Sequence, residues 1–371
     1  MRSWGQRRQF IALPWTLYQG DPNWIPPLIS NQRELLNYTR HPFYDESKIQ
    51  TFLAYRDGQP VGRIAAIVNA EHLKRYNDGR GFFGFFECID DQSVAHALFD
   101  AARDWLAGHG LKRIRGPANP SMNYECGLLI EGFDSPATFM MTYNPPYHAS
   151  LVESYGFRKG RDLLAYIGYR DQLPELEERL GPLADQAQRR CEADIRPLNL
   201  KKFREDVRLF LDLYNASLDI NWGFVPLTDR ELTKLAASLR MLLIPELTII
   251  AESEGRGVGV IIGLPDYNPR IKEINGRLFP FGFLRLLSRK KDFKRIRVLS
   301  INVAPEFQRW GLGLVLMRAL VPKAREISIE EAEFSWVDEE NDLARLGLEK
   351  GGAKIYKTYR MYDYEPAGAT S

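Results

Sequence analysis

Two glycines, Gly311 and Gly313, stand where an apolar strand gives way to an apolar helix, and this arrangement suits the binding of an anion. The strand-forming run 298–303 stops before Pro305, and leucines at helical spacing follow from Leu312. The first turn of a helix carries about four unpaired backbone N–H groups and roughly half a positive charge. Glycine lets a phosphate approach these groups without a Cβ in the way. The segment therefore predicts a pyrophosphate-binding loop.

The spacing Gln308-x-x-Gly311-x-Gly313 distinguishes this loop from two common phosphate-binding motifs. It lacks the Gly-x-Gly-x-x-Gly order of dinucleotide-binding folds, and no Gly-Lys-Ser/Thr follows as in a P-loop. The alternative is that the two glycines only make a tight turn between strand and helix. If the segment binds a ligand, the contacts come from Gln308, Arg309, Trp310, Gly311, Leu312, Gly313 and Leu314.

The loop and the elements after it resemble the acyl-CoA-binding region of the GNAT acyltransferases. An apolar strand, 331–337, and a glycine-terminated helix opened by Asn341 follow in the order that the family shows. The resemblance covers roughly 195–364, and its most specific parts are the loop and Asn341-x-x-Ala344. It implies that acetyl-CoA or a longer acyl-CoA is the co-substrate and that Asn341 contacts the CoA arm. Capping of the helix N-terminus alone would also explain Asn341.

The same resemblance places the reaction between the fourth and fifth strands of the fold. The peptide groups of Ile301, Asn302 and Val303 would pair with the pantetheine arm, and one N–H would face the thioester oxygen. A buried strand would equally explain these residues, and both interpretations can hold together.

Acyl transfer to an amine needs help with deprotonation, because an alkylamine with a pKa of about 10.4 is only about one part in a thousand neutral at pH 7. Glu333 is the candidate base, and it shares one face of the predicted strand with Ser335 and Val337. A solvent-exposed strand residue is the alternative. The tyrosine that the family often uses as an acid is replaced by Leu348, which leaves Tyr359 as a candidate acid or a packing residue. The other phenols of the last strand are Tyr356 and Tyr362.

The family builds its acceptor pocket after the first strand of the fold, which here implicates the segment 214–226. Asn221 and Trp222 lie in an aromatic cluster of this segment that Gly and Pro interrupt. The segment 116–128, rich in turn-forming residues, offers Tyr124 as a further wall. A lid over the core and a simple connection, respectively, are the alternatives for these two segments.

Two matches at one offset indicate an internal repeat. Residues 51–62 and 248–259 both predict a strand, an acidic-Gly turn and a strand, and they begin 197 residues apart. Residues 144–156 resemble 341–352, and an apolar strand follows each. We therefore predict an α/β fold (α+β, with a mixed sheet) made of two tandem acyl-CoA N-acyltransferase (GNAT-like) folds. The predicted domains are 1–190 and 191–371.

The first half lacks the glycine turn. Its strand 82–89 runs into Asp90 and Asp91 at the start of a helix over 92–107. Carboxylates can cap a helix N-terminus, but they would repel a pyrophosphate placed there. We therefore predict one CoA site, in the second half, and a degenerate first half that serves as a scaffold or as a wall of the acceptor pocket.

An insertion in the second half, 277–297, alternates basic with aromatic and aliphatic residues. This pattern is typical of a segment that lies at a membrane interface or holds an amphiphile. The alternative is a helix that packs its apolar side on the core and turns its basic side chains to water.

The composition limits the partners. The 371 residues carry 50 basic and 48 acidic side chains, a net charge of +2, which argues against a dedicated nucleic-acid binder. Three cysteines and five histidines show no metal-ligand spacing, so we expect no metal. No apolar run reaches the roughly 18 residues of a membrane span, and no signal peptide is recognisable. We expect a cytoplasmic protein, with peripheral contact at the inner membrane face as the alternative that 277–297 raises.

These features predict an acyl-CoA-dependent N-acyltransferase that transfers an acetyl or longer acyl group to a primary amine. The insertion makes an amphiphilic or lipid amine one alternative for the acceptor. A non-catalytic acyl-CoA sensor or scaffold is the competing function, because the usual tyrosine is missing and the first half is degenerate. The doubled peptidyl transferases that use aminoacyl-tRNA have a similar architecture, but the intact CoA loop argues against that donor.

Overall fold

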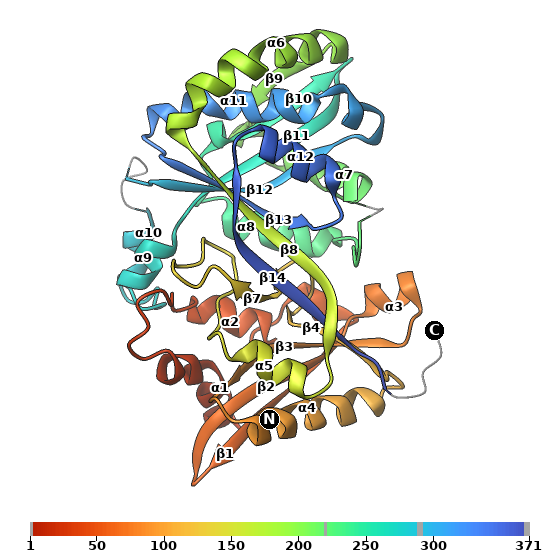
Figure 1. The fold of residues 1–371 in the computed structure, drawn as a ribbon, viewed down its shortest axis with the longest axis vertical. Coiled ribbons are helices and arrows are strands. Elements are labelled where there is room, and N and C mark those ends of the chain that lie inside the picture. The colour runs from red at the N-terminus through yellow and green to blue at the C-terminus, as the bar shows by residue number, and fades with distance from the viewer. Residues whose placement is uncertain (1–2, 219–220, 288–291, 367–371) are drawn as a thin grey trace. The chain divides into compact units, whose positions relative to one another are not determined.

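The computed structural model describes residues 3–218, 221–287 and 292–366 (Figure 1). The chain forms two compact units, and each is assembled from segments that are not consecutive in sequence. Unit 1 comprises Met1–Leu163, Asn268–Phe283 and Lys357–Ser371, and unit 2 comprises Leu164–Tyr267 and Leu284–Tyr356. The strands β8 (Arg158–Tyr169) and β14 (Lys354–Tyr364) contribute residues to both units. Each unit therefore contains residues from both of the predicted domains, 1–190 and 191–371.

Unit 1 is a mixed sheet covered by helices. Its strands run in the order β1-β2-β3-β4-β14-β8, and β7 also pairs with β14. The pairing of β3 with β4 is parallel, whereas β1–β2, β2–β3 and β4–β14 are antiparallel. The strands other than β8 and β14 are β1 (Lys48–Arg56), β2 (Gln59–Val68), β3 (Arg80–Cys88), β4 (Arg113–Gly116), β5 (Ala118–Asn119), β6 (Glu125–Cys126) and β7 (Leu128–Glu131). The helices are α1 (Trp4–Leu17), α2 (Ile29–Leu35), α3 (Ala70–Tyr76), α4 (Gln92–Ala107), α5 (His148–Ser154) and α9 (Asn268–Glu273), with a short 3-10 helix, η1 (Pro42–Asp45).

Unit 2 repeats the plan, with strands in the order β8-β13-β12-β11-β10-β9 and β12 parallel to β13. Its strands are β9 (Asp194–Pro197), β10 (Thr248–Ser253), β11 (Arg256–Pro265), β12 (Arg295–Val303) and β13 (Glu331–Asp338). The α-helices are α6 (Leu173–Cys191), α7 (Phe203–Leu218), α8 (Asp229–Leu239), α11 (Leu312–Glu326) and α12 (Asp342–Lys350), and α10 (Gly282–Leu287) contributes residues to both units. The 3-10 helices are η2 (Arg170–Gln172), η3 (Leu200–Lys202), η4 (Pro245–Leu247) and η5 (Pro305–Trp310).

The predicted repeat is confirmed in detail by the hairpins β1–β2 and β10–β11. Both turn through an acidic residue and a glycine at positive φ, which are Asp57-Gly58 in one hairpin and Glu254-Gly255 in the other. Both also carry a register irregularity immediately after an alanine, at Ala54 and at Ala251. These alanines are 197 residues apart, the offset read from the sequence. Such turns favour a left-handed backbone, which is why glycine recurs there.

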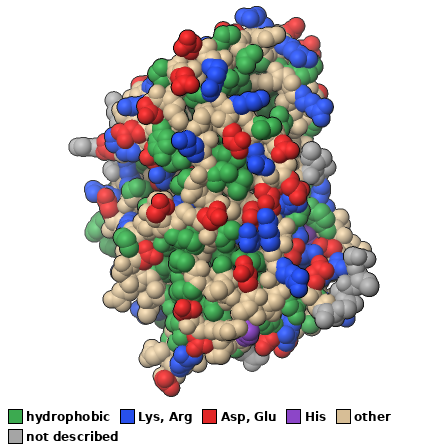
Figure 2. Space-filling model, in the orientation of Figure 1, with side chains coloured by type: hydrophobic (Ala, Val, Ile, Leu, Met, Phe, Trp, Pro, Cys, Tyr) green, Lys and Arg blue, Asp and Glu red, His purple; other side chains and the backbone are tan. Residues whose placement is uncertain are grey.

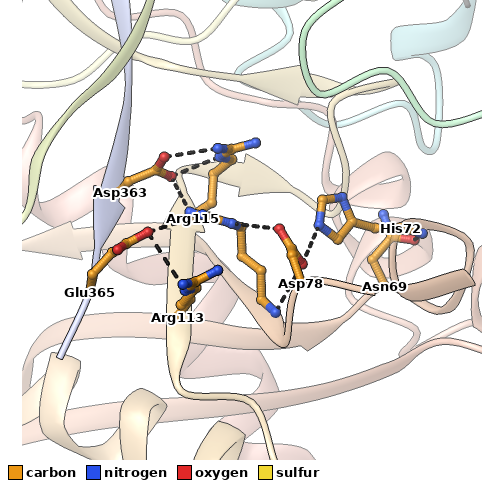
Figure 3. Close-up of polar contacts among 8 residues, drawn as sticks. Asn69, His72, Asp78, Arg113, Arg115, Asp363 and Glu365 are labelled. Atoms are coloured by element: carbon orange, nitrogen blue, oxygen red, sulfur yellow. Dashed lines mark hydrogen bonds and ion pairs between the residues drawn. The ribbon is translucent and has the colours of Figure 1, made fainter. Parts of the chain in front are cut away.

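The C-terminal end of β14 is fixed in unit 1 by a cluster of ion pairs (Figure 3). Asp363 accepts two hydrogen bonds from Arg115, at 2.7 and 2.8 Å, and lies 2.8 Å from Arg80. Arg80 also pairs with Asp78, which contacts His72 at 3.1 Å. The two arginines are more than 90% buried, so their charges depend on these carboxylates. The last strand of the chain thus belongs to the sheet that the N-terminal segment begins.

Among the helices formed by the described residues, none is both long enough and apolar enough to cross a membrane.

Candidate active site

The parallel strands β12 and β13 pair with each other over four residue pairs, and the described parts of both strands then continue without pairing to each other. The pairs run from Arg295↔Glu331 to Val298↔Phe334, whereas β12 extends to Val303. On its other edge β12 stays paired with β11 as far as Val303. The register with β11 shifts at Leu299, and such a bulge bends a strand and increases its twist. The edge of β12 beyond the bulge can therefore pair with an extended ligand, as an added strand would.

The predicted loop after β12 forms a short 3-10 helix, η5, and then α11, which begins at Leu312 as predicted. Gly311 joins them in a left-handed conformation, with φ +84, and a Cβ there would lie 3.0 Å from that of Ala187. A Cβ on Gly313 would meet nothing within 4 Å, and its φ is not in the left-handed range. The tight-turn alternative therefore explains Gly311 but gives no reason for Gly313.

The first turn of α11 is open to a ligand. No side chain caps it, since its N-cap residue is Gly311. The carbonyl of Gly311 accepts from the N–H groups of Leu314 and Val315, at 3.0 and 3.4 Å. The N–H groups of Leu312 and Gly313 precede these, in the part of a helix that lacks intrahelical acceptors. This is the geometry that the phosphate-binding hypothesis needs.

The side chains of the loop differ in their contacts. Gln308 donates a hydrogen bond of 3.2 Å to the carbonyl of Val303, so it holds the loop against the end of β12. Trp310 lies under the guanidinium of Arg190, at 4.8 Å. Arg309 is exposed. Contacts to a phosphate from Arg309 and the backbone stay predictions.

In the corresponding helix of unit 1, α4, a side chain caps the N-terminus. Asp91 accepts from the N–H groups of Ser93 and Val94, at 2.9 and 3.2 Å. Hydrogen bonds from the hydroxyl of Ser93, and then from Arg56, hold the pKa of Asp91 well below its usual range. A carboxylate thus occupies the donors that α11 leaves open, which supports a single CoA site in the second half.

The edge of β3, the strand of unit 1 that corresponds to β12, is filled by the chain itself. Gly84 lies so near the carbonyl of Ala118 that a Cβ would come within 1.9 Å of its oxygen. The side chain of Asn119 accepts from the N–H of Phe85, at 2.6 Å. No room is left along this part of β3 for a pantetheine arm.

A largely buried carboxylate, Glu87, distinguishes unit 1 further. It lies opposite Arg63 in the sheet, and Asn302 occupies the equivalent place opposite Val260 in unit 2. Glu87 accepts from the hydroxyl of Tyr18 at 2.7 Å and lies 3.5 Å from Arg63. Burial raises the pKa of Glu87 to about 7, against the opposing effect of the arginine.

Glu333 in unit 2 is completely buried, so the solvent-exposed alternative is wrong. The predicted face of Glu333, Ser335 and Val337 is confirmed, because these three alternate as the buried residues of β13. One carboxylate oxygen accepts from the hydroxyl of Ser335 at 2.5 Å, and the other accepts from the hydroxyl of Tyr356. Arg297 lies 3.9 Å from the carboxylate and donates to the Ser335 hydroxyl at 3.0 Å.

Two members of this network were not selected from the sequence. Arg297 was assigned to the end of the basic insertion 277–297, but in the structure it is the third residue of β12, and the neighbouring Lys294 and Arg295 gave the sequence no signal that singled it out. Of the three phenols in the last strand, Tyr359 was selected from the sequence and Tyr356 was not. In the structure Tyr356 contacts Glu333 in unit 2, whereas Tyr359 is buried in unit 1 opposite Leu129 of β7. The role of Tyr359 as an acid stays a prediction.

The other predicted CoA contacts occupy ordered positions. Asn302 is buried and accepts from the hydroxyl of Ser217 at 2.9 Å, so the end of α7 is tied to β12. Ile301 is partly buried beside it, and Val303 is buried. Asn341 caps α12 by accepting from the N–H of Ala344 at 3.1 Å, so the capping explanation is confirmed. A contact of Asn341 with CoA stays a prediction.

The predicted acceptor residues lie in separate units. Asn221 and Trp222 are half-buried in a turn of unit 2, where the carbonyl of Asn221 accepts from Phe224 at 3.2 Å. Residues 219–220 of the same segment lie outside the described residues. Tyr124 is buried in unit 1 with its ring edge-on to His41, at 5.5 Å. Their contact with an acceptor stays a prediction.

Neither a metal-binding group nor an excess of one charge distinguishes this site among the described residues (Figure 2). Within the described ranges, no three His, Cys, Asp or Glu side chains are grouped so that they could hold a metal ion. The cysteines Cys88, Cys126 and Cys191 are buried. Figure 2 shows acidic and basic side chains interspersed over the visible face, so no single sign of charge dominates it.

The sequence model of the acetyltransferase (GNAT) family matches residues 214–348, which include β12, the loop and β13. Protein YghO of Escherichia coli (strain K12) is 38% identical over 362 residues, covering 96% of this chain and 92% of that protein. The bacterial ceramide synthase of Caulobacter vibrioides (strain NA1000 / CB15N) is 35% identical over 370 residues, covering 96% of this chain and 94% of that protein. A solved tandem GNAT protein from the clavulanic acid biosynthesis pathway is similar in fold, with a TM-score of 0.53 at 12% identity over 99% of this chain and 95% of that one. The chain therefore belongs to the GNAT family, has the tandem form of its fold and is an acyltransferase.

Proposed function

We propose that this acyltransferase uses a long-chain acyl-CoA to acylate the amino group of a lipid amine, so that its product is an amide of the ceramide class. The observation that carries the proposal is the 35% identity, over nearly the full length of both chains, to a protein described as a bacterial ceramide synthase. A ceramide is the amide of a fatty acid with a long-chain amino alcohol. Acetyl transfer to a small amine is the alternative within the same family.

Acyl-CoA, when bound, supplies an activated thioester carbonyl. The open first turn of α11 is placed to hold the pyrophosphate, because its N–H groups and the helix dipole favour an anion. The edge of β12 beyond the bulge is placed to hold the pantetheine arm and to offer an N–H to the thioester oxygen. Together these elements fix the donor before the amine attacks.

Glu333 is the group that receives the proton of the amine, through Tyr356. The carboxylate has no exposed surface, whereas Tyr356 is partly exposed and donates to it. As the new C–N bond forms, the amine passes a proton to the phenol oxygen, and the phenol passes its own proton to Glu333. The C–S bond breaks, and the proton on Glu333 returns through Tyr356 and water to the departing thiolate, so the products are an amide and free CoA and the carboxylate is regenerated. Ser335 and Arg297 hold the carboxylate in place.

A matrix of donors and acceptors tests this function. Purified protein is incubated with palmitoyl-CoA or acetyl-CoA, together with a long-chain amino alcohol or a short alkylamine. Thiol release is followed with a chromogenic disulfide, and the amide is identified by mass spectrometry. We expect the highest kcat/KM for the pair of long chains. Faster acetylation of the short amine would refute the lipid acceptor, and CoA binding without turnover of any amine would support the sensor instead.

A further inference from the structure

The segment after α9 is held firmly on unit 1. The indole of Trp15 donates to the side chain of Asn275 at 2.7 Å, and the N–H of Ile29 donates to the carbonyl of Gly276 at 3.0 Å. Gly276 has φ +70 and packs so closely on Pro27 that a Cβ would lie 2.3 Å from its carbonyl oxygen. The residues that follow therefore project from a fixed base.

Beyond this base the chain turns large apolar side chains into solvent. Phe279 and Phe281 are the most exposed large apolar side chains among the described residues, at 79% and 73%. Phe283, Leu284 and Leu287 follow at 40%, 55% and 43%. We call residues 277–287 the aromatic loop.

The aromatic loop does not pack as the core-facing helix considered from the sequence. In α10 Leu286 is buried, whereas Phe283, Leu284 and Leu287 are exposed. The shape is nevertheless defined, since the N–H of Phe283 donates to the carbonyl of Leu278 at 2.9 Å. Five such side chains within nine residues form an exposed apolar patch, and patches of this kind mark interaction surfaces.

The charges around the patch indicate its partner. Arg277 and Arg285 are exposed, and no acidic residue occurs from 274 to 287. Aromatic side chains at the tip with basic side chains beside them match the boundary between the acyl chains and the headgroups of an anionic bilayer. A protein partner with an acidic rim would meet the same charges, but two phenylalanines that project almost completely are suited to insertion into lipid. Residues 288–291 lie outside the described residues and are not needed for this argument.

We propose that the aromatic loop docks the protein on an anionic membrane surface by inserting Phe279 and Phe281 between lipid headgroups. The proposal goes beyond the acyl-transfer function and does not depend on it, because binding to a bilayer and turnover of an amine are measured separately. Docking on a membrane surface suits an enzyme whose lipid substrate is held in a bilayer.

Flotation with vesicles tests the proposal on the full-length protein. Vesicles of phosphatidylcholine alone are compared with vesicles that also contain phosphatidylglycerol, at roughly 0.05 and 0.5 M salt, because salt screens the attraction of Arg277 and Arg285 to the surface. We expect binding to the anionic vesicles that weakens in high salt. The double variant Phe279→Ser with Phe281→Ser should bind these vesicles at least about tenfold more weakly than the unchanged protein. It should keep its circular dichroism spectrum and unfolding temperature, because both side chains are exposed.

A matched control is Met241→Ser with Leu343→Ser, which removes two apolar side chains of similar exposure, 65% and 64%, outside the aromatic loop. We expect this control to bind like the unchanged protein. The proposal is overturned if the Phe279 and Phe281 variant floats as well as the unchanged protein, or if the unchanged protein does not bind anionic vesicles. It is also overturned if the loop variant changes a dimer to a monomer in light scattering without changing flotation. Thiol release with soluble donors and acceptors, measured alongside, shows whether the acyl-transfer proposal fails separately.

Discussion

Substitution of Gly313 by aspartate should move stability and CoA affinity in opposite directions. A Cβ at this position meets nothing within 4 Å, and the position lies in the first turn of α11, so the fold can accept the new side chain. Replacing a helical glycine removes a cost of about 0.5–1 kcal/mol. A carboxylate near a helix N-terminus adds about 0.3–1 kcal/mol more. The free energy of unfolding should therefore stay equal or rise by up to about 1–2 kcal/mol.

The same carboxylate should weaken CoA binding strongly. It would lie beside the first-turn N–H groups that a phosphate would use and would repel the phosphate, whereas in α4 of unit 1 the carboxylate of the N-cap residue Asp91 accepts from such N–H groups directly. Hydrogen bonds to a charged group contribute about 1.5–3 kcal/mol each, so the loss of two costs about 3 kcal/mol or more. At about 1.4 kcal/mol per factor of ten, affinity for CoA should fall by roughly 150-fold.

Isothermal titration with CoA and thermal unfolding measure the two effects on the same preparations. Gly347→Asp is the matched control, because Gly347 is also helical, also has open space around it and lies outside the loop. Gly311→Ala serves as the structural counterpart, and its positive φ and the nearby Ala187 should lower stability by about 1–2 kcal/mol. Binding by a folded Gly313→Asp protein within about threefold of the unchanged protein would refute the phosphate-loop assignment.

Three further predictions concern carboxylates that are fully or partly buried. Glu333→Gln and Tyr356→Phe should each lower kcat by about 10²-fold or more with little effect on CoA affinity. An unchanged kcat for thiol release would exclude proton transfer from the amine through Tyr356 to Glu333. Because burial raises the pKa of Glu87 to about 7, the folded protein binds one proton more than the unfolded chain between about pH 4.5 and 7. Stability should therefore fall as pH rises through this window, by up to about 1.4 kcal/mol per unit, and Glu87→Gln should flatten the profile in denaturant unfolding. Asp363→Asn should lower the free energy of unfolding by about 2–3 kcal/mol, because it leaves the buried Arg80 and Arg115 underpaired. Asp185→Asn removes an exposed partner of Arg318 and should lower the free energy of unfolding by less than about 1 kcal/mol. Equal losses for the two variants in denaturant unfolding would contradict this distinction.

The sequence predicted the parts of the site that depend on neighbouring residues. The start of α11 at Leu312, the cap at Asn341 and the shared face of Glu333 and Ser335 all follow from periodicity, glycine placement and capping residues. The repeated hairpins were found in the same way, because an acidic-Gly turn between two strands is encoded within about a dozen residues. For these features the local signal and the final structure depend on the same backbone preferences.

Tertiary structure decided the surroundings of these parts. That Glu333 is buried with Tyr356 and Arg297 depends on which strands lie beside β13, and strand pairing is made by backbone groups that every residue carries. For the same reason the sequence did not show that β14 pairs in the sheet of unit 1, where Asp363 holds it to Arg115. Exposure of Phe279 and Phe281 was equally undecided, because an amphipathic pattern fits a covered helix and an uncovered one. The sequence by itself determined where the glycine loop and the acid would lie along the chain; only the assembly of distant segments decided which charges are buried together and which apolar side chains stay in water.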